Sequence, residues 1–243
     1  MTAERGVAVV TGGGTGIGAA CCRALAQEGF RVGVHYRSSE EAARKLAAQL
    51  PGAFLLQGDI AQPDDCDRLI GEIKEQAGRL DVLVNNAGLN RNGPMLTMKL
   101  DDYDAVAAVA RGTWYLTKLA LRRFMFRAES GRIITISSVV GHTGNPGQVP
   151  YTMAKAALDA MTKSLAQELG TRGVLVNAVA PGFIDTEMTG ELPAEVRESI
   201  LARVPLGRMG LAEEVADVVA FLATRGSYVQ GSVIHVNGGM FGG

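Results

Sequence analysis

The chain has 243 residues, of which 47% are hydrophobic and 20% are charged, and its formal net charge is −1. A chain of this length and composition folds as one soluble domain with a sizeable core. It has no basic block of the kind that binds nucleic acid or an anionic membrane surface, so we expect neither partner. No apolar stretch is long enough to span a bilayer, and the start lacks the pattern of a signal peptide. We therefore expect a cytoplasmic protein.

Strand-like segments alternate with amphipathic segments along the whole chain. Segments rich in β-branched residues predict strands at 7–11, 31–35, 53–57, 82–85, 132–137, 174–179 and 233–236. Apolar residues at helical spacing predict helices at 17–28, 40–50, from 63 onward, 101–127, 151–169, 194–202 and 212–223. Each parallel crossover needs a helix, so we predict a single doubly wound, Rossmann-like α/β domain over residues 1–243. Its parallel sheet would have about seven strands, with helices on both faces.

A glycine-rich segment, Thr11 to Gly18, stands between the first predicted strand and the first predicted helix. Glycines let the backbone turn sharply and approach a ligand, while a helix N-terminus carries partial positive charge. The pattern therefore predicts a site for the pyrophosphate of a dinucleotide, although a plain glycine-rich turn is the alternative. The predicted contacts are Gly12, Gly14, Thr15, Gly16, Ile17 and Gly18.

The end of the second predicted strand indicates which dinucleotide is bound. An acidic residue there would accept the ribose 2′-hydroxyl, but this chain has Arg37 followed by two serines. A guanidinium suits a 2′-phosphate, so NADP is favoured over NAD, with a solvated arginine as the alternative. Asp59 and Ile60, after the third strand, are the predicted adenine contacts. Asp59 is equally typical of a helix cap.

The strongest local signal is Tyr151-Thr-Met-Ala-Lys155 at the start of a predicted helix, preceded by Ser138 after the fifth strand. Tyr151 and Lys155 are four residues apart and share one helix face. A neighbouring ammonium lowers the ordinary tyrosine pKa of about 10 and makes a phenol a usable proton donor near neutral pH. Ser138 is placed to hydrogen-bond the same substrate oxygen. By spacing alone, a packed tyrosine and a solvated lysine explain the pattern equally well.

These blocks together resemble the short-chain dehydrogenase/reductase family across essentially the whole chain. The matching blocks are Thr11 to Gly18, Asn85-Asn86-Ala87-Gly88, Ser138, Tyr151 with Lys155, and Pro181-Gly182 with Ile184 and Thr186. Within the family, the sequence is most similar to the 3-oxoacyl-[acyl-carrier-protein] reductases, through the segments Gly131 to Ile136, Gly144-Asn145, Val179 to Thr186 and Asn237 to Met240.

The resemblance implies NADPH-dependent reduction of a 3-oxoacyl thioester on a carrier-bound fatty-acid or polyketide-type chain. Tyr151 would donate the proton, Ser138 would hold the carbonyl oxygen, and Lys155 would bind the nicotinamide ribose. Asn86 and Ala87 would support the cofactor, and Ile184 and Thr186 would meet the nicotinamide carboxamide. The resemblance also implies a homotetramer, for which the apolar tail at Met240 and Phe241 is a plausible contact.

Two departures from the family pattern affect these expectations. An Asn midway along the fourth helix helps hold a proton-carrying water in the family, and the matching position here is Ala110, which predicts slowed turnover. The family's basic patch for an acyl carrier protein is matched by Arg172, but Glu129 stands where a second basic residue would help.

Two other functions remain: NAD(P)-dependent oxidation of a small alcohol or sugar, and a catalytically weak subunit in a heteromer with an active paralogue.

Residues 186–203 carry apolar side chains at roughly helical spacing and predict a substrate lid.

The histidines at 35, 142 and 235 are scattered along the sequence, and the three cysteines lack ligand spacing, so we expect no metal site. His142 lies between Ser138 and Tyr151, and we interpret it as part of a loop surface.

Overall fold

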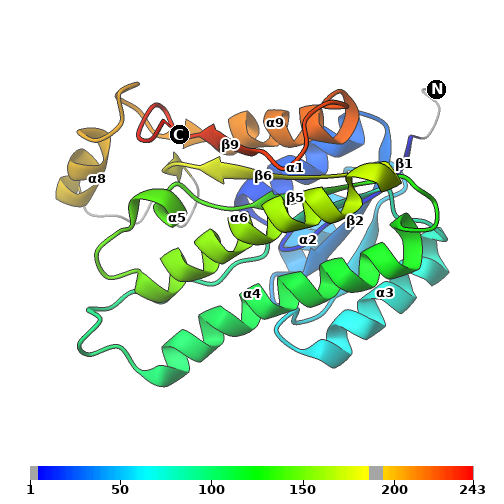
Figure 1. The fold of residues 1–243 in the computed structure, drawn as a ribbon, viewed down its shortest axis with the longest axis horizontal. Coiled ribbons are helices and arrows are strands. Elements are labelled where there is room, and N and C mark those ends of the chain that lie inside the picture. Colours follow the sequence, from blue (N-terminus) through cyan, green and yellow to red (C-terminus); the bar gives the residue numbers. More distant parts are fainter. Residues whose placement is uncertain (1–4, 186–193, 243) are drawn as a thin grey trace.

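The computed structural model describes residues 5–185 and 194–242 of the chain. Within these ranges, seven parallel strands form one sheet in the order β3-β2-β1-β4-β5-β6-β9, with helices on both faces (Figure 1). This confirms the predicted doubly wound α/β fold. The order reverses beside β1, whose neighbours are β2 on one side and β4 on the other.

The strands of the sheet are β1 (Gly6–Val10), β2 (Phe30–Tyr36), β3 (Phe54–Gln57), β4 (Val82–Asn85), β5 (Gly131–Ile136), β6 (Val174–Pro181) and β9 (Val233–Val236). The main helices are α1 (Gly16–Gln27), α2 (Glu40–Ala47), α3 (Pro63–Ala77), α4 (Leu100–Ala120), α6 (Val149–Leu169), α8 (Ala194–Leu201) and α9 (Ala212–Thr224).

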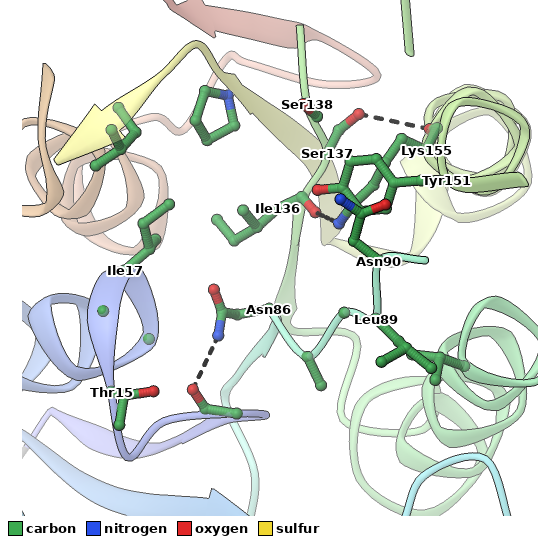
Figure 2. A pocket seen from close by; sticks show the side chains of 18 of the residues that line it. Thr15, Ile17, Asn86, Leu89, Asn90, Ile136, Ser137, Ser138, Tyr151 and Lys155 are labelled. Atoms are coloured by element: carbon green, nitrogen blue, oxygen red, sulfur yellow. Dashed lines mark hydrogen bonds between the residues drawn. The ribbon is translucent and has the colours of Figure 1, made fainter. Parts of the chain in front are cut away.

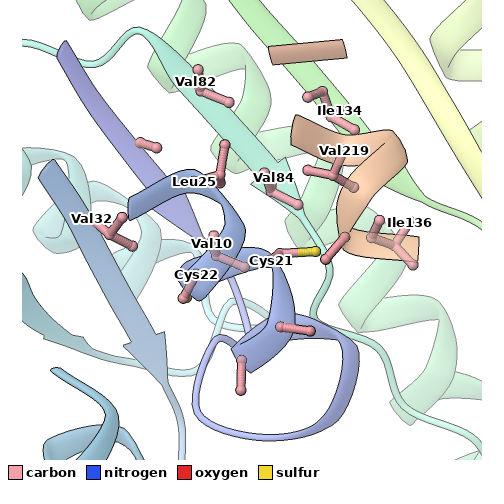
Figure 3. Packing of buried hydrophobic residues seen from close by; sticks show 14 of the residues in the cluster. Val10, Cys21, Cys22, Leu25, Val32, Val82, Val84, Ile134, Ile136 and Val219 are labelled. Carbon is pink, nitrogen blue, oxygen red and sulfur yellow. The ribbon is translucent and has the colours of Figure 1, made fainter. Parts of the chain in front are cut away.

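The core consists of two layers, one on each face of the sheet. Helices α1, α2 and α9 pack on one face, and α3, α4 and α6 pack on the other. Strand β1 is buried throughout because Ala8 and Val10 face the first layer while Val7 and Val9 face the second. Figure 3 shows the first layer, in which Cys21 and Cys22 are small packing residues. All three cysteines are free and buried.

The structure differs from the predicted elements mainly around the predicted catalytic residues. The stretch between the predicted strand 132–137 and the predicted helix 151–169 includes a short helix, α5 (Val140–Thr143), and the following helix begins at Val149 rather than at Tyr151. Four residues are too few to show helical periodicity, which is why α5 was missed. The fourth helix ends at Ala120 and continues as a π-helical turn over Leu121–Met125.

A second, two-stranded sheet pairs β7 (Ile184–Asp185) with β8 (Gly210–Leu211) and was not predicted. The predicted lid lies between these strands in sequence. Its first part, 186–193, is outside the described residues, so the lid stays a prediction, and its described part is α8 with the residues after it. None of the helices in the described ranges combines the length and the hydropathy that crossing a membrane would require.

Candidate active site

A cavity of about 580 Å³ opens at the carboxyl ends of the strands, where the strand order reverses between β1 and β4. Doubly wound sheets bind their ligands at this position. Most residues predicted from the sequence lie on its wall: Gly12, Thr15, Gly16, Ile17, Gly18, Arg37, Asp59, Ile60, Asn86, Ala87, Ser138, Tyr151, Lys155 and Ile184.

Two predicted residues are not on the described wall. Gly14 faces α2, where an added Cβ would lie 2.9 Å from Ser39 Oγ and 3.4 Å from Ala43 Cβ. Its missing side chain therefore lets α2 approach the glycine-rich loop. Thr186 lies outside the described residues.

The glycine-rich loop depends on glycine at specific points. Gly12 and Gly16 have φ angles of 62° and 52°, a region that disfavours side chains. A Cβ on Gly18 would overlap the Gly12 carbonyl oxygen and lie 2.6 Å from Asn86 Nδ2. The Thr15 side chain makes no capping hydrogen bond, so the amides at the start of α1 are left for an anion.

Asn86 ties the end of β4 to this loop. Its side-chain amide donates to the carbonyl oxygen of Thr11 at 2.9 Å and to that of Gly12 at 3.0 Å (Figure 2). The Thr11 hydroxyl oxygen accepts in return from the backbone amides of Asn86 and Ala87. Two strand ends are thereby joined directly beneath the predicted pyrophosphate position.

His35 is a second crosslink, which sequence reasoning missed. The Gly12 amide donates to His35 Nδ1 at 3.1 Å, and His35 Nε2 lies 3.1 Å from the Gly58 carbonyl oxygen. With Nδ1 accepting, Nε2 carries the proton and donates. The ring is 2% exposed, and burial lowers its pKa from 6.5 to about 4. A neutral imidazole thus connects the glycine-rich loop to the segment after β3.

The end of the cavity that we expect to hold the adenosine carries the predicted specificity residues. Arg37 Nη1 lies 3.8 Å from Asp59 Oδ2, and the Arg37 side chain is 56% exposed. Asp59 Oδ1 also accepts from the Ala61 amide at 3.0 Å, so the aspartate shapes its own turn as well as facing the cavity. The Arg37 guanidinium retains donors for a bound phosphate.

The catalytic candidates lie together at the other end of the cavity (Figure 2). Lys155 is 5% exposed; its Nζ donates to the Ile136 carbonyl oxygen at 2.7 Å and lies 5.5 Å from the centre of the Tyr151 ring. The Ser138 hydroxyl oxygen accepts from the Val140 amide at 3.4 Å. A hydroxyl, a phenol and an ammonium therefore border one space, which suits proton donation to an oxygen held there.

Amide side chains join two loops beside this catalytic end. Asn145 donates to Gln148, and both Gln148 and Asn90 donate to Asn92 Oδ1, at 2.9 to 3.0 Å. The Gly93 amide also donates to the Gly147 carbonyl oxygen at 3.0 Å. Asn90 and Gln148 line the cavity, so this network forms part of its substrate end. No local motif in the sequence points to it.

The wall contributed by α4 is apolar where it meets the cavity. Val109, which is 8% exposed, lines the cavity, whereas Ala110 does not belong to its lining. The match of Ala110 to the family's Asn stays a prediction.

The interpretation of His142 as loop surface is also wrong. His142 is in α5 with a side chain only 19% exposed, and its ring lies 4.7 Å from the His235 ring and 5.2 Å from the Phe241 ring, between centres. Two of the histidines described as scattered are therefore in contact. Phe241, expected at a subunit contact, packs here against its own chain.

Comparison with known proteins gives matches along nearly the whole chain. The family described as Enoyl-(Acyl carrier protein) reductase matches residues 12–241. The chain is 42% identical to the 3-oxoacyl-[acyl-carrier-protein] reductase FabG of Staphylococcus aureus, covering 96% of this chain and 97% of that one. It is 45% identical to a 3-oxoacyl-[acyl-carrier-protein] reductase of Synechocystis, covering 99% and 98%, and 41% identical to FabG of Salmonella typhimurium, covering 99% of each.

The His35 crosslink predicts a defect in cofactor binding. His35→Leu removes both the acceptor for the Gly12 amide and the donor to Gly58, so the glycine-rich loop loosens. We expect the Kd for NADPH to rise about tenfold, the size of one or two lost hydrogen bonds, with kcat at saturation nearly unchanged. His35→Asn, which retains an acceptor, should be affected less. Fluorescence titration with NADPH measures this, and unchanged affinity in His35→Leu would contradict it.

The same histidine contributes to the pH dependence of stability. The unfolded chain protonates His35 near pH 6.5 and the folded chain only near 4, so its stabilising contribution is complete above pH 6.5 and is lost as the pH falls toward 4. The full loss is about 3 kcal/mol. Urea unfolding at pH 7 and pH 4.5 should show a smaller decrease for His35→Asn than for the wild type.

Proposed function

This chain belongs to the short-chain dehydrogenase/reductase family, and we propose that it reduces the 3-oxo group of an acyl thioester to a 3-hydroxy group with NADPH. The observation that carries the proposal is the grouping of Ser138, Tyr151 and Lys155 at one end of a cavity whose other end is a glycine-rich loop. The relatives reported above supply the substrate class, since several are 3-oxoacyl-[acyl-carrier-protein] reductases.

The residues fit a dinucleotide phosphate. Gly12 and Gly16 leave space where a side chain would stand, the first amides of α1 are available to the pyrophosphate, and Arg37 is available to a 2′-phosphate. Asp59 and Ile60 border the adenine position, and Asn86, Ala87 and Ile184 border the nicotinamide end. When bound, reduced NADP supplies a hydride to the carbonyl carbon of the substrate.

The chain's own residues handle the oxygen and the proton. Ser138 and Tyr151 donate hydrogen bonds to the substrate carbonyl oxygen and stabilise the negative charge that develops on it. Tyr151 then gives its proton to that oxygen, and the nearby Lys155 ammonium stabilises the resulting phenolate. Because Lys155 is fixed by the Ile136 carbonyl group, its charge stays beside the tyrosine throughout.

We also propose an acyl carrier protein as the bearer of the substrate, with a surface that departs from the family pattern. Arg172, which matches the family's basic patch, is paired with Glu129 at 3.1 Å and its guanidinium lies 4.7 Å above the Phe126 ring. An acidic carrier would meet a partly neutralised patch here. Assembly as a homotetramer, or as a heteromer with an active paralogue, stays a prediction.

Removing the phenolic hydroxyl tests the proposed reaction. With 3-oxoacyl thioester and NADPH, Tyr151→Phe should lower kcat at least a hundredfold because the proton donor is lost, while the Kd for NADPH changes little. Tyr228→Phe is a matched control, since Tyr228 is fully exposed. Near-normal turnover in Tyr151→Phe would contradict the assigned proton donor. If the wild type binds NADPH but reduces no 3-oxoacyl thioester, the substrate class is wrong.

Cofactor preference is tested at Arg37. Arg37→Ala should lower kcat/KM for NADPH about tenfold to a hundredfold and leave kcat/KM for NADH within about twofold, because only NADPH carries the 2′-phosphate that the guanidinium contacts. Arg44→Ala is the control, because Arg44 lies on the exposed surface of α2, paired with Glu40. An equal loss with both cofactors would mean that Arg37 does not select the phosphate.

Carrier recognition is tested by changing the charge beside Arg172. Glu129→Lys frees Arg172 and adds a cation, so kcat/KM for a carrier-bound substrate should rise about threefold to tenfold at low salt, and the gain should shrink as salt is added. The same variant should not change kcat/KM for the corresponding coenzyme A thioester. Glu41→Lys, on α2 across the sheet, is the control. Equal gains with both substrates, or none, would exclude carrier docking at this patch.

A further inference from the structure

A cluster of titratable side chains lies behind the catalytic wall and is not used in the proposed reaction. His142 Nε2 of α5 lies 3.0 Å from Asp159 Oδ2 of α6, a close contact without hydrogen-bond geometry. Their side chains are 19% and 6% exposed. Asp159 follows Lys155 by one helical turn, and His142 is four residues beyond Ser138. The pair therefore joins α6, which carries Tyr151 and Lys155, to α5, which begins two residues after Ser138.

Two further contacts hold α5 and the strand end before it against α6 at the same level. A Cβ on Gly141 would lie 3.2 Å from the Ala156 nitrogen and 3.3 Å from the Lys155 carbonyl carbon, so the backbones are packed closely. The Ser137 hydroxyl donates to the Lys155 carbonyl oxygen at 3.5 Å (Figure 2), and the Ser137 side chain also lowers the pKa of Asp159. Ser138 lies between Ser137 and α5, so all of these contacts bear on its position.

The charges around the pair are arranged on several elements. Asp159 faces His142 from α5, Ser137 from the end of β5, and Lys155 and Lys163 from its own helix. Burial raises the pKa of Asp159, and these neighbours oppose the rise. The carboxylate is thus costly to bury and depends on its partners.

The ring of His142 is fixed from the opposite side. His235 of β9 meets it edge-on at 4.7 Å, and Phe241 stacks on it at 5.2 Å. Burial lowers the pKa of His235, the charge of His142 lowers it further, and Asp159 opposes the change. Asn237 Nδ2 donates to the Phe241 carbonyl oxygen at 2.9 Å and turns the tail back onto the histidines. His142 therefore has little freedom to leave Asp159.

We propose that Asp159 and His142 are positioning residues, which hold α5 against α6 and so fix Ser138 relative to Tyr151 and Lys155. Neither residue belongs to the cavity lining that the described residues form, so we assign them a positioning role and no direct contact with the reacting groups. Their effect is exerted through the Ser137 hydroxyl, the backbone of Lys155 and the start of α5. The inference deepens the proposed function and rests on it for the kinetic readout.

The experiment compares Asp159→Asn, His142→Gln and their double variant with Glu168→Gln, an exposed acid on the same helix. With NADPH and a 3-oxoacyl thioester, each single variant should lower kcat about tenfold to a hundredfold, because misplaced catalytic groups lose rate. The Kd for NADPH should stay within about twofold. The double variant should be no slower than the worse single variant, since the two residues act as a unit. Glu168→Gln should match the wild type.

Hydrogen exchange gives a readout that needs no activity. Backbone amides of segments 137–143 and 152–160 should exchange faster in both single variants than in Glu168→Gln, with segment 82–88 unchanged. If the wild type reduces no 3-oxoacyl thioester, the proposed function is wrong. The hydrogen-exchange rates then still test whether Asp159 and His142 hold α5 against α6. Unchanged kcat and exchange, a fully additive double variant, or loss of NADPH binding would overturn the positioning role. Asp159→Asn replaces a buried carboxylate with a neutral amide, so we expect this variant to fold. If it unfolds, His142→Gln, at a partly exposed position, decides the outcome.

Discussion

The catalytic end of the cavity depends on one buried cation. Burying an ammonium group costs several kcal/mol unless it is paired, and Lys155 is almost completely buried. The Ile136 carbonyl group at the end of β5, the face of the Tyr151 ring and the negative charge of Asp159 offset that cost. These partners come from one strand end and one helix. The bond to Ile136 ties this point of α6 to the end of β5, and Tyr151, one turn earlier on the same helix, lies beside the ammonium.

The cofactor end is built in a different way, from backbone groups. Glycines allow the chain to turn after β1, and what keeps that turn in shape is a set of crosslinks from neighbouring strand ends. Asn86 reaches it from β4 and His35 from β2, and both bond groups of Gly12. The loop is thus fixed before any ligand arrives, which reduces the ordering cost of binding. A neutral histidine serves this purpose because it accepts from one segment while donating to another.

Local patterns in the sequence were sufficient for the fold and for naming side chains that line one cavity; the catalytic roles of those side chains stay predictions. The bounds of β4 and β9 agree with the prediction, since both are short runs of strand-forming residues with clear ends. Tyr151 and Lys155 were identifiable because a spacing of four on a helix is visible in one dimension. The contact between His142 and His235 was not, because it joins α5 to β9 through the fold. His35 was missed for the same reason, as its partners lie on loops after two other strands.

The α4 wall presents an apolar side chain to the cavity. The resemblance assigned a water-binding role to a side chain in the middle of this helix, and the chain has Val109 where the helix faces the cavity. Valine offers no hydrogen bond to a water, and the carbonyl oxygen of Val109 already accepts from the Thr113 hydroxyl at 3.1 Å. In the proposed reaction, the proton that Tyr151 gives up must be replaced, and the Val109 side chain offers no hydrogen bond to a water that would carry it. The Lys155 ammonium, with one N–H bonded to Ile136, has two remaining protons for this return path. Slow proton return at this wall is therefore a physical reason for the slowed turnover that the missing amide predicts.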